Sequence, residues 1–400
     1  MHRLLSILLL LAAFFIFTSC QKPLSPSSDL SDPDDGRISE ASISAAEEKS
    51  NPEIPDTSLS EPEDSEPLSP PLDFRVTDVF FPQCFQKYMV PPSLLYGEYI
   101  ISNPYGENSR NTYAVSADSR SERDLGFYGW DVKADADFYY WMDCKLMDVS
   151  GALTKTNKIT LESTVLLKLE GERNIFPRLS MSGNHIVWVE GVDVEHYYIM
   201  VYDIKEHKLD REIPVNYYYH PTAAPELCGD WLIYVEIADD RYQINCLDLT
   251  GGEHWRHAVS EGQDNEPLGT TEDGRPIFWS SSEPIGIATD GKRLFWSSME
   301  GIFCCEGSDG EEQLIREGPL GTDVALLMDR YLVYGYDFNM YVYDTATAEL
   351  IFSGEPEGNT EYGGFFNVSE NAESVVFQGW DRDDPETCFI AELGLEKAER

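Results

Sequence analysis

The sequence predicts an all-β protein built from repeated antiparallel hairpins, and three observations lead to this prediction. Beyond residue 73 the chain is rich in Tyr, Trp, Phe, Val and Ile, the residue types that favour strands. Turn residues recur at short intervals, and no segment shows the apolar period of a helix. A turn residue followed by a compact apolar and aromatic run recurs seven times, beginning at Gly97, Asp137, His185, Trp231, Arg293, Tyr331 and Ser374.

The spacing of these runs indicates a β-propeller. Aromatic side chains hold corresponding positions in five runs, and successive ones are 46, 62, 38 and 43 residues apart: Trp188, Tyr234, Trp296, Tyr334 and Phe377. A period in the forties is typical of propeller blades. We therefore predict that residues 74–400 form a propeller of seven four-stranded blades, with six or eight blades as the alternatives.

The pattern within each run supports this architecture. The central strands of a blade are covered on both faces by neighbouring blades, so they are expected to be continuously apolar, as Ile186–Val189 and Leu232–Val235 are. A polar turn and a second strand with an acidic end follow, as in Tyr198–Asp203. Asp-Gly pairs such as Asp290-Gly291 predict tight hairpin turns. Each repeat therefore begins as an antiparallel hairpin.

Two segments depart from the regular repeat. The long interval between Tyr234 and Trp296 contains a near-copy of the strand motif, too short for a blade, so Glu266–Glu283 is predicted to be an inserted hairpin, with an eighth, incomplete blade as the alternative. An early strand near Val76–Phe85 is expected to pair with the last blade around Cys388–Leu393 and to close the ring.

The amino end resembles the leader of bacterial lipoproteins. Arg3 precedes an apolar stretch, Leu4–Phe17, which is too short to span a bilayer, and Phe17-Thr18-Ser19-Cys20 follows. The resemblance implies a signal peptide over residues 1–19 and acyl chains on Cys20. The expected location is the outer face of a bacterial cell membrane, or the outer membrane in a Gram-negative host. An ordinary secretory leader is the alternative.

Residues 20–73 are predicted to be a disordered, acidic linker that follows the lipidated cysteine. From Gln21 to Asp73 the chain is rich in Ser, Pro, Asp and Glu and poor in aromatic residues, so it cannot bury enough apolar surface to offset the entropy of ordering. Repeated Pro residues and like charges favour an extended tether.

The charge of the chain limits the kinds of partner. The formal net charge is -43, and about -33 of it falls beyond the linker. Nucleic acid and bare anionic lipid are repelled by such a surface. We therefore expect contact with the membrane through the lipid alone, and a protein or glycan as the ligand.

The hairpin ends resemble the repeats of the TolB, YVTN and quinoprotein-like propellers. The matching segments are Leu247-Asp248-Leu249-Thr250-Gly251 with Trp255, and Tyr343–Ala348. The resemblance implies a propeller that frequently binds protein, and no particular ligand.

Cysteine and histidine residues do not indicate a cofactor or a metal site. Cys304 and Cys305 are adjacent within a predicted strand, so their side chains are expected on opposite faces, as buried thiols. His254 and His257 are likewise expected to diverge. If the ring closes as predicted, Cys84 and Cys388 come near one another and could form a disulfide.

Two Gly-Trp-Asp segments, one early and one late, are the candidate ligand-binding rim: Trp130, Asp131, Trp380 and Asp381. Exposed Trp side chains suit carbohydrate or peptide stacking, and packed Trp beside acidic turns is the alternative. The sequence thus favours a non-catalytic binding or scaffolding module. A carbohydrate-active hydrolase or lyase with carboxylates in the central channel is one alternative, which converging acidic and aromatic side chains would favour. An envelope assembly factor is another.

Overall fold

The computed structural model describes residues 74–80, 92–102, 111–145, 148–193, 196–216, 223–238, 241–260, 265–270, 276–318, 322–354, 360–383 and 388–395. These ranges belong to one compact unit, Leu68–Arg400. All elements within them are β-strands, and these ranges hold no helix with the length and apolar character needed to cross a membrane. The predicted leader and linker, Cys20 included, lie outside the described residues.

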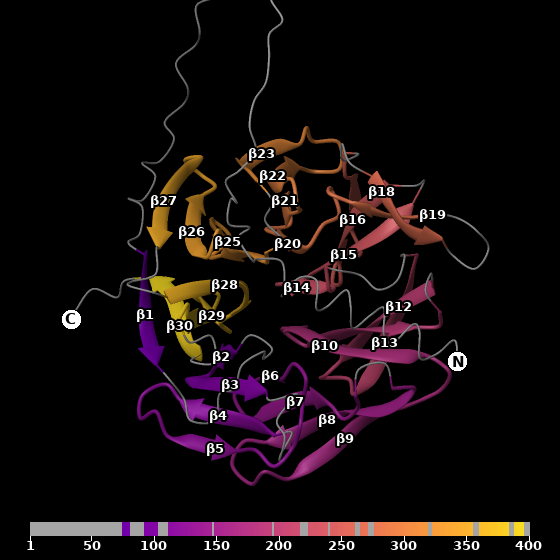
Figure 1. The fold of residues 1–400 in the computed structure, drawn as a ribbon. Helices are drawn as coiled ribbons and strands as arrows, with labels where there is room; N and C mark the ends of the chain where they lie inside the picture. Colours follow the sequence, from indigo (N-terminus) through magenta and orange to yellow (C-terminus); the bar gives the residue numbers. More distant parts are fainter. Residues whose placement is uncertain are drawn as a thin grey trace, which may run out of the picture. The chain divides into compact units, whose positions relative to one another are not determined.

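Seven four-stranded sheets form the blades of a propeller (Figure 1). Blades 1 to 4 comprise β2 (Ser93–Leu95), β3 (Glu98–Ser102), β4 (Thr112–Ser116) and β5 (Glu122–Asp124); β6 (Lys133–Ala134), β7 (Phe138–Met142), β8 (Ser150–Asn157) and β9 (Ser163–Glu170); β10 (Asn174–Ser182), β11 (His185–Gly191), β12 (His196–Asp203) and β13 (Lys208–Asn216); β14 (Glu226–Cys228), β15 (Trp231–Ala238), β16 (Arg241–Asp248) and β17 (His254–Ala258). Blades 5 to 7 comprise β20 (Gly286–Thr289), β21 (Arg293–Ser297), β22 (Gly301–Glu306) and β23 (Gln313–Glu317); β24 (Val324–Leu327), β25 (Tyr331–Tyr336), β26 (Asn339–Asp344) and β27 (Glu349–Gly354); β28 (Thr360–Val368), β29 (Ser374–Asp381), β30 (Cys388–Leu395) and β1 (Phe74–Phe80). The prediction of seven blades is confirmed.

The seven aromatic runs are the second strands of the blades, from β3 to β29. Their side chains are covered by the neighbouring blades on both faces, so Trp188 and Phe377 have no exposed surface and Trp296 has 1%. Burial of such a side chain stabilises the fold by about 1.5–3 kcal/mol. Continuous apolar character in these runs is therefore a consequence of packing between blades.

The ring is closed by the strand at the amino end of the propeller. β1 pairs antiparallel with β30, from Phe74 opposite Leu395 to Phe80 opposite Ile390. β1 is thus the outer strand of blade 7, whose other three strands come from the carboxyl end of the chain. The predicted closure is confirmed, although the strand covers Phe74–Phe80, whereas Val76–Phe85 was predicted.

The predicted insertion is a separate hairpin. β18 (Asn265–Thr270) and β19 (Pro276–Ser280) form their own two-stranded sheet between blades 4 and 5. The pair adds no strand to either blade, which confirms an inserted hairpin and leaves seven blades in the ring.

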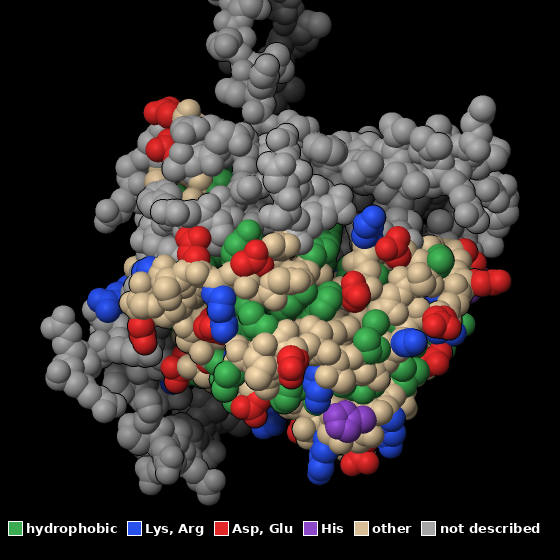
Figure 2. Space-filling model, turned by 90° about the horizontal axis from the view of Figure 1, so that it is seen from below, with side chains coloured by type: hydrophobic (Ala, Val, Ile, Leu, Met, Phe, Trp, Pro, Cys, Tyr) green, Lys and Arg blue, Asp and Glu red, His purple; other side chains and the backbone are tan. Residues whose placement is uncertain are grey.

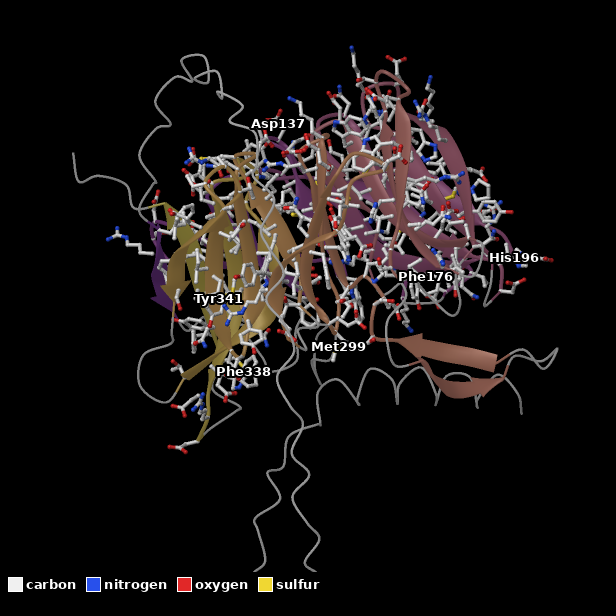
Figure 3. All side chains as sticks on the ribbon, turned by 90° about the horizontal axis from the view of Figure 1, so that it is seen from above. Asp137, Phe176, His196, Met299, Phe338 and Tyr341 are labelled. Carbon is white, nitrogen blue, oxygen red and sulfur yellow. The ribbon has the colours of Figure 1, made fainter. Side chains whose placement is uncertain are left out.

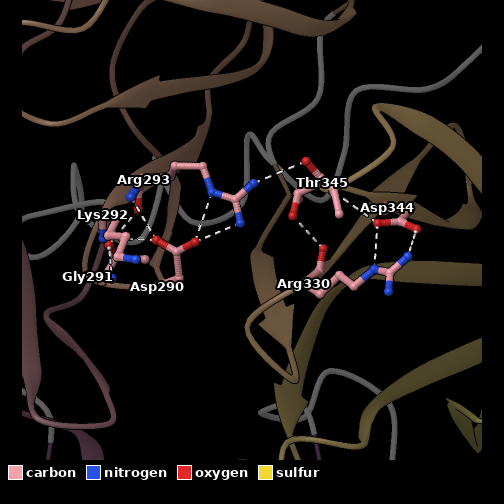
Figure 4. Close-up of polar contacts among 9 residues, drawn as sticks. Asp290, Gly291, Lys292, Arg293, Arg330, Asp344 and Thr345 are labelled. Carbon is pink, nitrogen blue, oxygen red and sulfur yellow. Dashed lines mark hydrogen bonds and ion pairs between the residues drawn. The ribbon is translucent and has the colours of Figure 1, made fainter. Parts of the chain in front are cut away.

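Arginine side chains connect adjacent blades near the hairpin turns (Figure 4). Asp290 accepts hydrogen bonds from the amides of Lys292 and Arg293, which confirms the predicted turn, and also pairs with the Arg293 guanidinium at 2.7 Å. Arg293 then donates to the carbonyl oxygen of Thr345 in blade 6. Within blade 6, Arg330 binds the fully buried carboxylate of Asp344 through two hydrogen bonds of 2.9 and 2.6 Å.

The strand order gives the ring two different faces. The connection face carries the links between blades and the turns from second to third strands, and the turn face carries the other turns. With the ring seen edge-on (Figure 3), Phe176, Met299 and Phe338 mark the connection face, and Asp137 marks the turn face. The hairpin β18–β19 stands on the same side as Met299 and Phe338.

Candidate functional site

The first strand of each blade surrounds the axis of the ring, and neighbouring first strands such as β6, β10 and β14 contact one another. In β10 the ladder is interrupted, because Phe176 pairs with Val189 and Ser180 pairs with Val187, so that four residue steps in β10 lie opposite two in β11. Such a bulge re-aims a side chain. The bulge in β10 lies at Arg178. The Arg178 side chain is 42% exposed, although the residue belongs to an innermost strand.

Arg178 is the centre of a group of charged side chains from four blades. Its guanidinium donates to Glu226 Oε1 at 3.5 Å and lies 3.9 Å from Asp323 Oδ1. Glu226 begins the first strand of blade 4, and Asp323 directly precedes that of blade 6. In blade 2, Lys133 Nζ lies 3.1 Å from Asp131 Oδ1. We call these residues the axial cluster: Asp131, Lys133, Arg178, Glu226 and Asp323.

Electrostatic coupling joins Arg178 and Asp323 to Glu226 and Asp131. Partial removal of the guanidinium from water works to lower the pKa of Arg178, but Asp323, Glu226 and Asp131 outweigh this effect, so the pKa is raised and the guanidinium stays charged. Burial raises the pKa of Asp323 to about 6; Glu226 and Asp131 add to this, and Arg178 and the amide of Phe366 oppose it. Asp323 can therefore gain or lose a proton near neutral pH.

The backbone of β28 (Thr360–Val368) completes the surroundings of Asp323. Asp323 Oδ2 accepts a hydrogen bond of 3.2 Å from the amide of Phe366 in β28. A second bulge, between Tyr362 and Phe366, interrupts β28 in the same way as the one in β10. Phe365 lies in this bulge and is 47% exposed. The axis thus combines carboxylates, a guanidinium and an accessible aromatic ring.

We expect Asp323→Asn to stabilise the protein at pH 7.5. The pKa of Asp323 is higher in the folded protein than in the unfolded chain, so the folded form binds more protons at pH values between these two pKa values. Asp323 therefore favours folding at low pH and opposes it as the pH rises through about 6. The difference from 3.8 corresponds to roughly 3 kcal/mol. Thermal unfolding at pH 7.5 and at pH 4.5 measures the gain, which should shrink at the lower pH.

Asp344→Asn is the matched control for this substitution. Arg330 holds the pKa of Asp344 below its usual range, so loss of that charge should lower the melting temperature at pH 7.5. Equal destabilisation by both substitutions would show that Asp323 is an ordinary structural ion-pair partner.

The structure places the predicted rim residues on the connection face, in different settings. Asp131 is 6% exposed and belongs to the axial cluster through Lys133, and Trp130 precedes it in the link between blades 1 and 2. Trp380 and Asp381 end β29, and the indole Nε1 of Trp380 donates to Glu361 Oε2 at 2.8 Å. Asp131 is thus the predicted residue that lies within the site.

The predicted divergence of the two adjacent cysteines and of the two histidines is confirmed in part. Cys305 is buried and Cys304 half-buried, both as thiols. His257 is buried against Glu312, and His254 is exposed. Cys84 lies outside the described residues, so its pairing with Cys388 stays a prediction. Within the described ranges, no group of three His, Cys, Asp or Glu side chains is arranged to hold a metal ion.

Sequence reasoning missed most of the axial site: Lys133, Arg178, Glu226, Asp323 and Phe365. A positional signal was present, because Asp131 and these last four residues lie five to nine positions before the aromatic second strand of their own blade. That offset places a residue at or within the first strand, the strand nearest the axis. The bulges that expose Arg178 and Phe365 have no such signal.

Charge is distributed over the outside of the ring. Seen from below (Figure 2), Lys and Arg side chains lie among the Asp and Glu side chains of the visible face.

No family model and no curated protein match the chain. Solved structures are similar to it: a chain of the mitotic checkpoint complex (13% identity, 85% of this chain and 100% of that chain, TM-score 0.51), oligogalacturonate lyase in complex with manganese (12%, 82% and 97%, 0.49), and TolB from Acinetobacter baumannii (12%, 76% and 64%, 0.37). At these identities the likeness concerns the propeller fold alone.

Proposed function

We propose that the protein is a lipid-anchored, extracytoplasmic binding module that takes a polar ligand at the axis of its propeller. The axial cluster is the observation that carries this proposal. Within the described part of the chain, the five donors of the Arg178 guanidinium have one long hydrogen bond, to Glu226. Donors that remain available beside carboxylate acceptors suit a ligand with hydroxyl or amide groups.

The lipid anchor is proposed from the leader and tested at Cys20. Cells that express the full chain are grown with an alkyne-bearing fatty acid, and the purified protein is examined for the label. The label is expected on the wild-type chain and is expected to be lost in Cys20→Ser, which cannot form the thioether. An unlabelled wild-type chain would point to an ordinary secretory leader, and a labelled Cys20→Ser chain would show that the label is attached elsewhere than at Cys20.

Asp323 supports a second candidate function, a carbohydrate-active hydrolase or lyase. A carboxyl group with a pKa of about 6 can serve as a general acid or base, and converging acidic and aromatic side chains favour this reading. Binding has more support because each carboxylate of the cluster has a cationic partner. Release of new reducing ends by the wild type, and its loss in Asp323→Asn, would favour the enzyme.

A further inference from the structure

Two aromatic side chains meet on the connection face between blades 6 and 7. Phe338 lies in the turn between β25 and β26, and Trp380 lies near the end of β29. Their ring centroids are 6.2 Å apart at 83°, an edge-to-face contact. Both side chains are half-buried, so neither is enclosed in the core. Figure 3 shows Phe338 at the margin of this face.

A carboxylate fixes the indole and adds polar groups beside it. Glu361 accepts from Trp380 Nε1 through Oε2 at 2.8 Å and pairs through Oε1 with Arg382 Nε, also at 2.8 Å. The Arg382 side chain is 54% exposed. An aromatic surface with a guanidinium and a carboxylate at its edge offers apolar contact, donors and acceptors in one place.

The backbone at Phe338 has a conformation in which a large side chain is unfavourable, so the presence of Phe at this position calls for an explanation. Asp337 and Phe338 are the central residues of a two-residue turn and have φ values of 46° and 61°. Turns of this kind favour Asn-Gly or Asp-Gly, because both central residues have positive φ. Phe at the second position costs about 1 kcal/mol relative to Gly, and its ring contacts the next blade.

We propose that Phe338 and Trp380 form a stacking subsite for one ring of a neutral oligosaccharide that extends from the axial cluster. Both parts share one strand, since β28 carries Glu361 near its start and, further along, the amide of Phe366 that donates to Asp323. The apolar face of a pyranose packs on aromatic rings, and its hydroxyls pair with groups such as Glu361 and Arg382. An anionic saccharide is disfavoured by the net charge of the chain. The inference rests on the proposed function, because it adds a subsite to the same ligand.

The test uses the full chain with gluco-, manno-, xylo- and chito-oligosaccharides of two to six residues, and binding is measured by calorimetry. Phe338→Gly removes the ring and also suits the positive φ, so the fold should remain intact. We expect affinity for the longest ligand that binds to fall about tenfold. Tyr96→Gly is the matched control: Tyr96 has a φ of 54° and is 46% exposed, but lies on the turn face, and its replacement should leave affinity unchanged.

The outcomes separate failure of the subsite from failure of the proposed function. If Arg178→Ala weakens binding of every length and Phe338→Gly changes none, the axial site stands and the stacking subsite is wrong. If Phe338→Gly weakens binding and Arg178→Ala does not, the subsite stands without the axial site. If none of these oligosaccharides binds to the wild-type chain, the stacking proposal is overturned.

Discussion

A chain that begins at residue 81 should lose cooperative folding. Deletion of residues 1–80 removes β1, which supplies the fourth strand of blade 7 and pairs with β30 along its length. Phe74, 8% exposed, leaves a cluster that includes Tyr331, Phe377 and Leu393. Loss of a buried Phe alone costs about 3–5 kcal/mol, and the whole strand contributes more. The free energy of folding of a domain is about 5–15 kcal/mol.

The measurement is thermal unfolding together with the aggregation state of the truncated chain. Without β1, the apolar strand β30 becomes an exposed edge that can pair with other chains, so aggregation is expected with the loss of the transition. The control is deletion of residues 21–60, which leaves β1 in place and should leave the melting temperature unchanged. A truncated chain that unfolds cooperatively at the wild-type temperature would show that blade 7 closes without β1.

Arg178→Ala should weaken ligand binding by about 30-fold. The substitution removes the charged donor at the centre of the axial cluster, and hydrogen bonds to charged groups contribute about 1.5–3 kcal/mol each. Calorimetric titration with the oligosaccharides named above measures the change. Because Glu226 and Asp323 lose a cationic partner, the pKa of Asp323 should rise further.

Arg211→Ala is the control for loss of an arginine. Like Arg293, Arg211 bridges two blades, since its guanidinium donates to the carbonyl oxygen of Leu249 in the next blade at 2.9 Å. Its replacement should lower stability slightly and leave affinity unchanged. Equal weakening by both substitutions would mean that the effect comes from the fold and not from the axial cluster.

Much of the fold was predictable because packing between blades imposes a local sequence pattern. A strand covered on both faces must be apolar throughout, and this requirement produced the aromatic runs that predicted β11 (His185–Gly191) and β15 (Trp231–Ala238). Ring closure was predictable because the last blade would otherwise present a strand edge with unpaired backbone N–H and C=O groups. The bounds of β1 were less predictable, because residues that follow Phe80 share its apolar character.

The site was less predictable because it depends on irregular backbone. Asp131 was a candidate through its Gly-Trp-Asp segment, but Arg178 resembled any isolated arginine in the sequence. Its role arises from a bulge in β10 and from carboxylates that are distant along the chain, such as Asp323. A repeat pattern defines which strand lies near the axis, but not which of its side chains faces solvent there.

The most direct test of ligand binding at the axis is photocrosslinking in intact cells that export the full chain. p-Benzoylphenylalanine replaces Phe365 at the axis or, as the control, Ile159, which is 90% exposed in the turn between β8 and β9 on the turn face. We predict that irradiation followed by mass spectrometry finds a bound partner on the chain substituted at Phe365 and none on the chain substituted at Ile159. Equal labelling at both positions, or labelling at Ile159 alone, would contradict the account.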